Sequence, residues 1–90
     1  MTITVKRTSQ TTFKVTVKQR RTITTHRVTV PLDYWHKLTG GTTPPKTLVE
    51  KSFEFLLERE PNTSILGRFG LSEIQGYFPE YEKTIKRMLV

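Results

Sequence analysis

Residues 11–30, TTFKVTVKQRRTITTHRVTV, carry the feature that most constrains how this chain can fold. From Phe13 to Lys18, apolar and polar, mostly basic, side chains alternate at every position. A period of two places alternate side chains on opposite faces of a β-strand, so this segment is predicted to be a half-buried strand with a basic outer face. Residues 22–30 are rich in Thr, Ile and Val, which favour a second strand. The intervening residues 19–21 are the expected turn of a hairpin.

The alternation changes phase within the second predicted strand. His26 and Val28 have one parity, whereas Ile23 has the other. We expect a β-bulge within residues 24–26, because one extra residue would bring these side chains to the same face.

Proline and glycine residues divide the rest of the chain. Pro31 cannot donate to a strand ladder and should end the hairpin. Residues 32–38 are expected to form a short helix that the following glycines stop. The main helix is predicted at residues 44–60, with a proline at its first position and Pro61 after its end. Further short helical segments are expected at residues 64–69, at residues 72–78 and from residue 79 onward.

These elements predict one small α+β domain. It has an N-terminal antiparallel β-hairpin, a short helix, one main helix and C-terminal short helices, and Ile3 and Val5 suggest a third, N-terminal strand. We divide the chain into a basic β-ribbon (residues 1–30), a helical pair similar to a helix-turn-helix (31–60) and a C-terminal helical segment (61–90). With 90 residues and no cysteine, the domain lacks disulfides and thiolate metal sites. Small domains of this kind often gain burial by self-association, so a homodimer is expected.

Charge is divided unequally along the chain. Residues 1–30 contain seven Lys and Arg and no Asp or Glu, whereas residues 31–90 contain eight of each sign. This asymmetry indicates an anionic partner for the basic ribbon. An alternative interpretation is a solvated sheet edge on which Lys residues prevent aggregation.

Duplex DNA is the anionic partner that suits the ribbon best. Lys and Arg neutralise phosphates, Arg and Thr can contact base edges, and a two-stranded ribbon is narrow enough for the major groove. Readers of single-stranded RNA use exposed aromatic side chains on a sheet. The ribbon offers only Phe13, on the apolar face beside Val15 and Val17, so that platform is missing.

Catalytic and metal-binding residues are scarce. His26 and His36 are the only histidines and Asp33 is the only aspartate. Asp33 and His36 are one helical turn apart and could orient an imidazole or supply two metal ligands, but no third ligand or nucleophile has a suitable spacing. We therefore expect no enzyme activity, no cofactor, no metal and no small-molecule substrate.

Membrane insertion and secretion are not expected. The longest apolar run is residues 55–57, too short to span a bilayer, and MTITVKR lacks the apolar stretch of a signal peptide. A cytoplasmic location is the default expectation.

The main helix is apolar on two faces. One stripe consists of Val49, Phe53, Leu56 and Leu57, and Leu48 and Phe55 lie nearly opposite, so the helix should be buried on two sides. The second side is expected to meet either the C-terminal segment or a second protomer. The residues considered for a partner or dimer interface are Leu48, Phe55, Phe69, Tyr77 and Phe78.

Residues 26–60, HRVTVPLDYWHKLTGGTTPPKTLVEKSFEFLLERE, resemble the ribbon-helix-helix DNA-binding fold in their order of strand, short helix, glycine turn and longer helix. The resemblance implies that the strand pairs with its twin across a dimer and that Thr25, Arg27 and Thr29 face DNA. The chain departs from that pattern in its short first helix, its long connection at residues 39–45 and its additional preceding strand.

Two other resemblances concern shorter segments. RVTVPLDYWHKLTGG is similar to the strand–Pro–short helix–Gly element of swapped-hairpin bacterial regulators and antitoxins, although there more strands should follow. FEFLLEREPNTSIL and GLSEIQGYFPEY are similar to small uncharacterised bacterial proteins. Both named families include DNA-binding antitoxins with a C-terminal arm that engages a partner. Residues 65–81 could be such an arm, or part of the domain's own core, which we favour.

The sequence therefore predicts a small, cytoplasmic, homodimeric DNA-binding regulator of antitoxin type, acting in transcription. Two alternatives stay open: a protein-interaction module whose basic ribbon docks an acidic partner, and a protein that binds structured RNA. The predicted nucleic-acid contacts are Lys14, Lys18, Arg20, Arg21, Thr25, Arg27 and Thr29.

Overall fold

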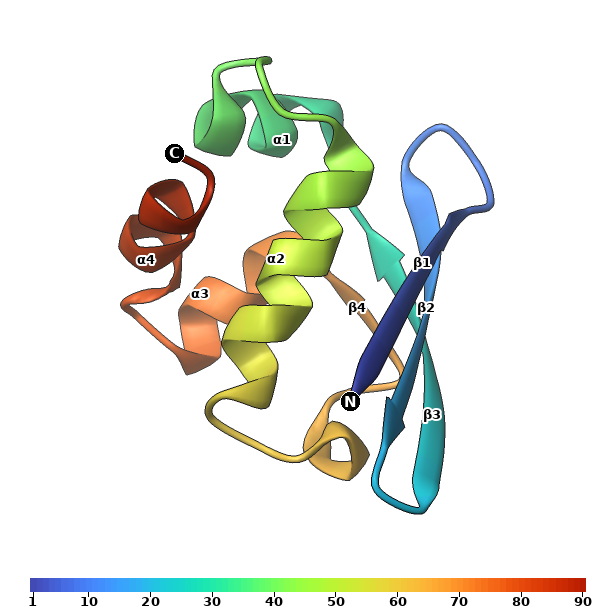
Figure 1. Cartoon of the computed structure of the whole chain (residues 1–90). Coiled ribbons are helices and arrows are strands. Elements are labelled where there is room, and N and C mark those ends of the chain that lie inside the picture. Colours follow the sequence, from blue (N-terminus) through green and yellow to red (C-terminus); the bar gives the residue numbers. More distant parts are fainter.

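A computed structural model describes all residues from Met1 to Val90 and shows an α+β fold (Figure 1), as predicted. Helices cover one face of a four-stranded sheet whose strand order is β1-β2-β3-β4. The strands are β1 (Thr2–Arg7), β2 (Thr12–Gln19), β3 (Thr22–Thr29) and β4 (Arg68–Gly70). The helices are α1 (Leu32–Thr39), α2 (Pro45–Leu57), α3 (Ile74–Tyr77) and α4 (Tyr81–Met88), with 3-10 turns η1 (Asn62–Ser64) and η2 (Leu71–Glu73).

The first three strands form an antiparallel meander, which confirms the hairpin and the third, N-terminal strand. Pairing of β2 with β3 is uninterrupted from Thr12↔Thr29 to Gln19↔Thr22. The bulge expected within residues 24–26 is therefore wrong. His26 stays in phase with Val28 on the inner face, and Ile23 is 66% exposed on the outer face.

His26 is buried without a bulge because both ring nitrogens have partners. Its Nδ1 donates to the carbonyl oxygen of Leu66 at 2.8 Å, and its Nε2 accepts from the hydroxyl of Thr24 at 2.8 Å. An imidazole satisfied in this way can occupy a core position that the alternation would otherwise give to an apolar residue.

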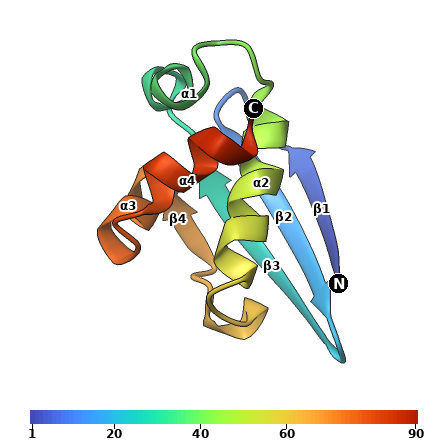
Figure 2. The ribbon, with the colours of Figure 1, turned by 60° about the vertical axis from the view of Figure 1, so that its left-hand side comes forward.

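Helix α2 packs across the inner face of the sheet (Figure 2) and forms the centre of the core. On the sheet side, the Phe53 ring lies 5.3 Å from that of His26 and 6.1 Å from that of Phe69. On the opposite side, the Phe55 ring lies 5.2 Å from Tyr81 and 5.9 Å from Phe78. The second apolar face of the main helix thus meets the C-terminal segment of the same chain.

This packing corrects most of the expected partner interface. Leu48 and Phe55 are fully buried in the protomer's own core, and Phe69 is 6% exposed and packs mainly within the same core. Phe78 is partly buried against that core, and only Tyr77 is largely exposed.

The helices of the central region lie close to their predicted bounds. The segment expected at residues 32–38 is Leu32–Thr39, and the one expected at residues 44–60 is shorter, Pro45–Leu57. Gly40 ends α1 at φ +66°, a left-handed conformation in which its N–H donates to the carbonyl oxygen of His36. None of the helices combines the length and the apolar composition needed to cross a bilayer.

The helical segment expected at residues 64–69 is wrong. Residues Arg68–Gly70 instead form β4, which pairs in parallel with β3, and Arg27 N donates to Gly67 O at 2.8 Å just before it. The backbone groups of residues 67–70 thus form hydrogen bonds with the edge of β3 that β2 leaves free, while Phe69 enters the core. The next segment begins at Leu71 and not at Ser72, with Gly70 as its N-cap; the Gly70 N–H donates to the Glu73 carboxylate.

A buried polar network fixes the chain between α2 and β4 to the β2–β3 hairpin. The Asn62 side chain, 2% exposed, donates to the hydroxyl of Thr24 at 3.0 Å, and the Asn62 backbone N–H donates to the side-chain oxygen of Gln19 at 3.0 Å. The Thr24 hydroxyl in turn donates to His26. The network therefore positions residues 62–66, which lead into β4.

Replacing Asn62 by Ala is expected to lower the free energy of unfolding by about 1–3 kcal/mol, because the part-buried hydroxyl of Thr24 loses the hydrogen bond that the Asn62 side chain donates to it. Chemical denaturation measures this change. The control is Thr63→Ala at the exposed neighbouring position, where a change within about 0.5 kcal/mol is expected. Equal effects of the two substitutions would contradict the role given to Asn62.

Arg20, in the two-residue turn between β2 and β3, has φ +56° and is the only non-glycine residue at positive φ. Arg20→Gly should raise the free energy of unfolding by about 0.5–1 kcal/mol, since glycine has no Cβ to strain in this conformation. Arg21→Gly, at a negative φ, should give no gain. Thermal and denaturant unfolding of both variants tests this difference.

Candidate nucleic-acid interface

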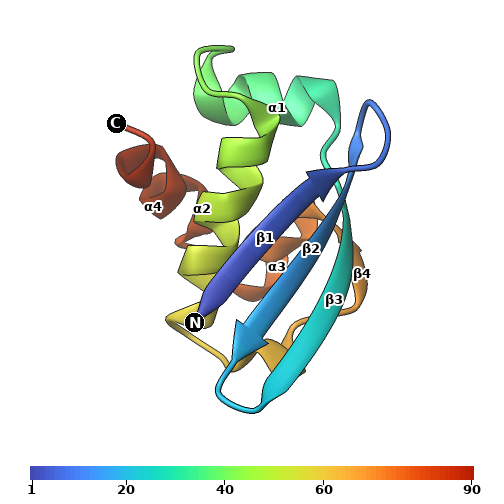
Figure 3. The ribbon, with the colours of Figure 1, turned by 45° about the vertical axis from the view of Figure 1, so that its right-hand side comes forward.

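The outer face of the sheet is free of covering elements, because the helices all lie against the other face (Figure 3). Its side chains follow from the alternation of the strands. The outward positions are Thr2, Thr4, Lys6, Thr12, Lys14, Thr16, Lys18, Ile23, Thr25, Arg27, Thr29 and Arg68. This surface contains no acidic and no aromatic side chain, so it combines positive charge with threonine hydroxyl and methyl groups.

Four cationic residues form one continuous row across all four strands. The strand register pairs Lys6 with Lys14, Lys14 with Arg27, and Arg27 with Arg68. We call these four residues the basic row. With neighbouring strands ~4.8 Å apart, the row spans roughly 14 Å.

No acidic side chain neutralises the basic row. The ion pairs of the protein are Lys37–Glu82, Lys51–Glu54 and Arg59–Glu80, all on the helical side. The row therefore presents four unpaired positive charges to solvent, an arrangement suited to an anionic ligand.

Threonines lie on both sides of the basic row. Thr4, Thr16 and Thr25 are paired across β1, β2 and β3 in the adjacent outward row, and Thr12 pairs with Thr29 on the other side. Each threonine can donate or accept a hydrogen bond, and its methyl group can contact a thymine methyl. Lys18, four residues from Lys14 on the same face, extends the positive surface by roughly 14 Å along β2.

The structure brings five of the predicted nucleic-acid contacts together on this face: Lys14, Lys18, Thr25, Arg27 and Thr29. Arg20 and Arg21 lie apart from them, at the tip of the hairpin. Arg20 lines a shallow polar depression beside Glu58 at the end of α2, so its side chain is not part of the basic row.

Sequence reasoning left two members of the basic row out of the predicted site. Lys6 could have been included, because it shares the parity of Thr2 and Thr4 in the first strand. Arg68 had no usable signal, since a three-residue strand is too short to show a period. Arg7 is held elsewhere: its guanidinium donates to the carbonyl oxygens of Ser9 and Gln10.

The residues considered for catalysis lie on α1, away from this face. The carboxylate of Asp33 accepts a hydrogen bond from the Tyr34 backbone N–H at 2.9 Å, and His36 is exposed. No group of three or more His, Asp or Glu side chains is arranged to hold a metal ion.

No protein-family model, curated protein or solved structure matches this chain. The topology itself bears on the ribbon-helix-helix resemblance. Since β3 is paired with β2 on one side and, over its last residues, with β4 on the other, it is an interior strand of the sheet. The pairing of this strand with its twin across a dimer, which the resemblance implies, stays a prediction; within the protomer, β1 and β4 hold the outer edges of the sheet.

The basic row should cost stability, because like charges directly opposite on paired strands repel. Lys14 has Lys6 and Arg27 as direct neighbours, so Lys14→Thr is expected to raise the free energy of unfolding by about 0.5–1 kcal/mol at low salt. The gain should shrink at 1 M salt, where the Debye length falls to about 3 Å.

The matched control is Lys18→Thr, on the same strand and face. Its direct neighbours, Thr2 and Ile23, are uncharged, so a smaller gain with little salt dependence is expected. Denaturant unfolding of both variants at two salt concentrations makes the comparison. Equal gains would show that repulsion within the row is not the cause.

Proposed function

We propose that this protein is a non-enzymatic regulator that binds duplex DNA through the outer face of its sheet. The observation that carries the proposal is the basic row, in which four cationic residues from four strands align without a counter-charge. Phosphates are the anions that such an array of Lys and Arg neutralises most effectively.

The dimensions of the face support a duplex as the ligand. The row spans roughly 14 Å, comparable with the ~12 Å width of the major groove of B-DNA. Strands are known to enter either groove of DNA in other proteins. With the cations of the row near the phosphates, the neighbouring threonines would lie over base edges.

The composition of the face argues against single-stranded ligands. Stacking on exposed aromatic side chains supplies much of the affinity for single strands. Phe13, the only aromatic residue of the first three strands, is buried on the inner face. Duplex RNA shares the phosphate chemistry and is the closest competitor to DNA.

The antitoxin-type resemblance adds a homodimer, a transcriptional role and a cytoplasmic location to the proposal. The edge strand β1 offers a route to the dimer, because its outer backbone groups have no partner strand. Pairing of two β1 strands would extend the sheet and double the basic outer face.

Binding to a duplex of 20–30 base pairs should weaken as the salt concentration rises. In a plot of the logarithm of the affinity against the logarithm of the salt concentration, each neutralised phosphate should contribute about −0.9 to the slope. The double variant Lys14→Gln/Arg27→Gln should lower this slope by about 2 and weaken binding to all sequences. Fluorescence anisotropy with labelled duplexes measures both quantities.

The matched control is Lys83→Gln/Lys86→Gln on α4, which removes the same charge from the helical side. Its slope should remain that of the unaltered protein. Absence of binding to duplex DNA at low salt contradicts the proposal. Tighter binding to an RNA duplex would assign the face to RNA, and binding only to an acidic protein would support the interaction module.

A further inference from the structure

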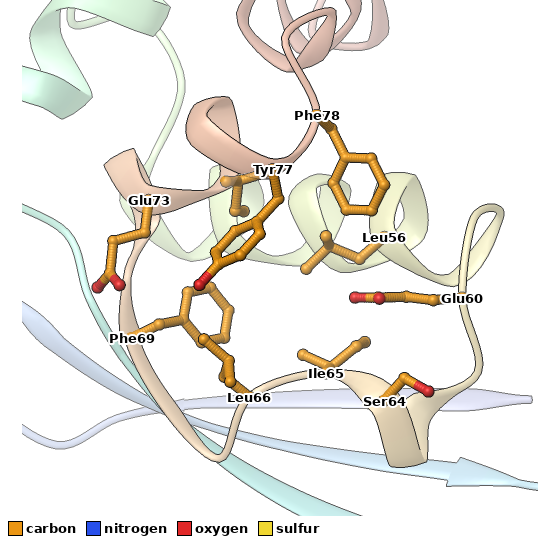
Figure 4. A pocket seen from close by; sticks show the side chains of 10 residues that line it. Leu56, Glu60, Ser64, Ile65, Leu66, Phe69, Glu73, Tyr77 and Phe78 are labelled. Carbon is orange, nitrogen blue, oxygen red and sulfur yellow. The ribbon is translucent and has the colours of Figure 1, made fainter.

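A cavity of about 270 Å³ opens on the helical side of the molecule, away from the outer face of the sheet (Figure 4). It lies between the end of α2, the chain leading into β4, and α3. Seven of its ten lining residues are hydrophobic, and Leu56, Ile65, Phe69 and Phe78 form much of the wall. Its volume is near the lower end of small-molecule sites, which begin at about 300 Å³.

One carboxylate lies in this apolar wall. The Glu60 side chain extends between Leu56 and Ile65, with its oxygens directed into the cavity. It forms no hydrogen bond or ion pair within the protein, and partial burial raises the pKa of its carboxyl. A carboxylate in such surroundings gains from a cationic partner that restores the lost solvation.

Arg59, the cationic residue next to Glu60 in the sequence, does not pair with the Glu60 carboxylate. Arg59 is held on the other side of the chain by an ion pair with Glu80 at 3.0 Å and by a hydrogen bond to the carbonyl oxygen of Phe55. Its guanidinium also stacks on the Phe55 ring, 3.6 Å from the centroid. No Lys or Arg lines the cavity.

The second carboxylate at the cavity already has a partner. Glu73, from η2, accepts a hydrogen bond from the Gly70 N–H at 2.6 Å. Glu60 is therefore the acidic group available to a ligand.

Aromatic side chains complete the site. Phe69 and Phe78 contribute to the wall, and the Tyr77 ring lies over the opening with its hydroxyl directed toward Phe69 and Leu66. Tyr77 is 66% exposed and Leu66 is 47% exposed, which leaves apolar surface at the rim of the opening. Aromatic rings around a carboxylate favour an ammonium group through cation–π attraction.

We propose that this cavity binds a small organic ammonium ion, in which an apolar or aromatic group carries one amine. The apolar part would lie against Phe69, Ile65 and Phe78, and the ammonium would pair with Glu60. The site is on the opposite side of the molecule from the basic row, so the proposal does not rest on nucleic-acid binding.

The test uses the full chain and 2-phenylethylamine, which is positively charged at neutral pH. Two probes of similar shape are compared with it, the neutral 2-phenylethanol and the anionic 3-phenylpropionate. Titrations followed by amide NMR should show shifts at residues 60–78. The amine should bind about tenfold more tightly than the alcohol, because a charged hydrogen bond is added, and the acid should bind most weakly.

Two variants separate the charge from the apolar wall. Glu60→Gln should weaken amine binding about tenfold and leave the affinity for the alcohol unchanged. Tyr77→Ala, at an exposed position, should weaken both probes. Glu58→Gln is the matched control, because Glu58 is only two residues from Glu60 but lies outside this cavity. This variant should change neither affinity.

Four results would overturn the proposal. Three of them are equal affinity for amine and alcohol, an amine affinity that Glu60→Gln leaves unchanged, and no chemical-shift change up to the solubility of the amine. A fourth is dissociation of a dimer by Glu60→Gln, which would mean that the cavity receives a side chain of a second copy. The titrations contain no nucleic acid, so their outcome is independent of the DNA-binding measurements.

Discussion

The burial of α2 between the sheet and the C-terminal helices is the interaction on which the rest of the structure depends. Phe53 packs toward β3 and β4, while Phe55 packs toward α4, where the hydroxyls of Ser52 and Tyr81 are hydrogen-bonded at 2.7 Å. Burying each large apolar side chain contributes about 1.5–3 kcal/mol, so a single two-faced helix can organise a core in a chain of 90 residues. One consequence is that every helix lies on the same side, which leaves the outer face of the sheet bare.

That bare face keeps features that cost stability. On this face Lys14 stands directly between two other cations, Lys6 and Arg27, whose repulsion opposes the pairing of the strands. Threonine at the other outward positions suits a strand without needing a covering layer, so the fold does not require the charges. Features that a fold does not require and that oppose its stability concentrate at functional sites. This reasoning supports a ligand on the outer face independently of the net charge.

The parts of the fold that were predictable are those that repeat along the chain. The alternation of Phe13, Val15 and Val17 identified both the strand and its faces, and the outward residues followed from parity. Ile23 misled the prediction, because an isoleucine in a strand was expected on the inner face, whereas it is exposed on the outer face. His26 keeps the inner position, and its burial depends on partners at Thr24 and Leu66, the second of which is distant in sequence.

The parts that were not predictable depend on where the chain returns after α2. Strand β4 is only three residues long and pairs with a strand far away in the sequence: Arg68 is paired with Arg27, 41 residues earlier. No local sequence pattern therefore predicts this strand. The cavity has the same origin, since its walls come from α2, residues 64–69 and α3. Both features depend on the tertiary contacts of residues 61–78. These contacts cannot be predicted from short apolar stretches such as Ile65–Leu66 alone.

Strand β4 also connects the two sites physically. Adjacent residues of an extended strand point to opposite faces, so Arg68 ends the basic row while Phe69 lines the cavity. The preceding residues are fixed to β3 through the bonds from Arg27 to Gly67 and from His26 to Leu66. A ligand that packs against Phe69 and Leu66 would hold this short edge strand in place, and with it the fourth cation of the row. Strand β4 is thus the one element that contributes both to the basic row, through Arg68, and to the cavity wall, through Phe69.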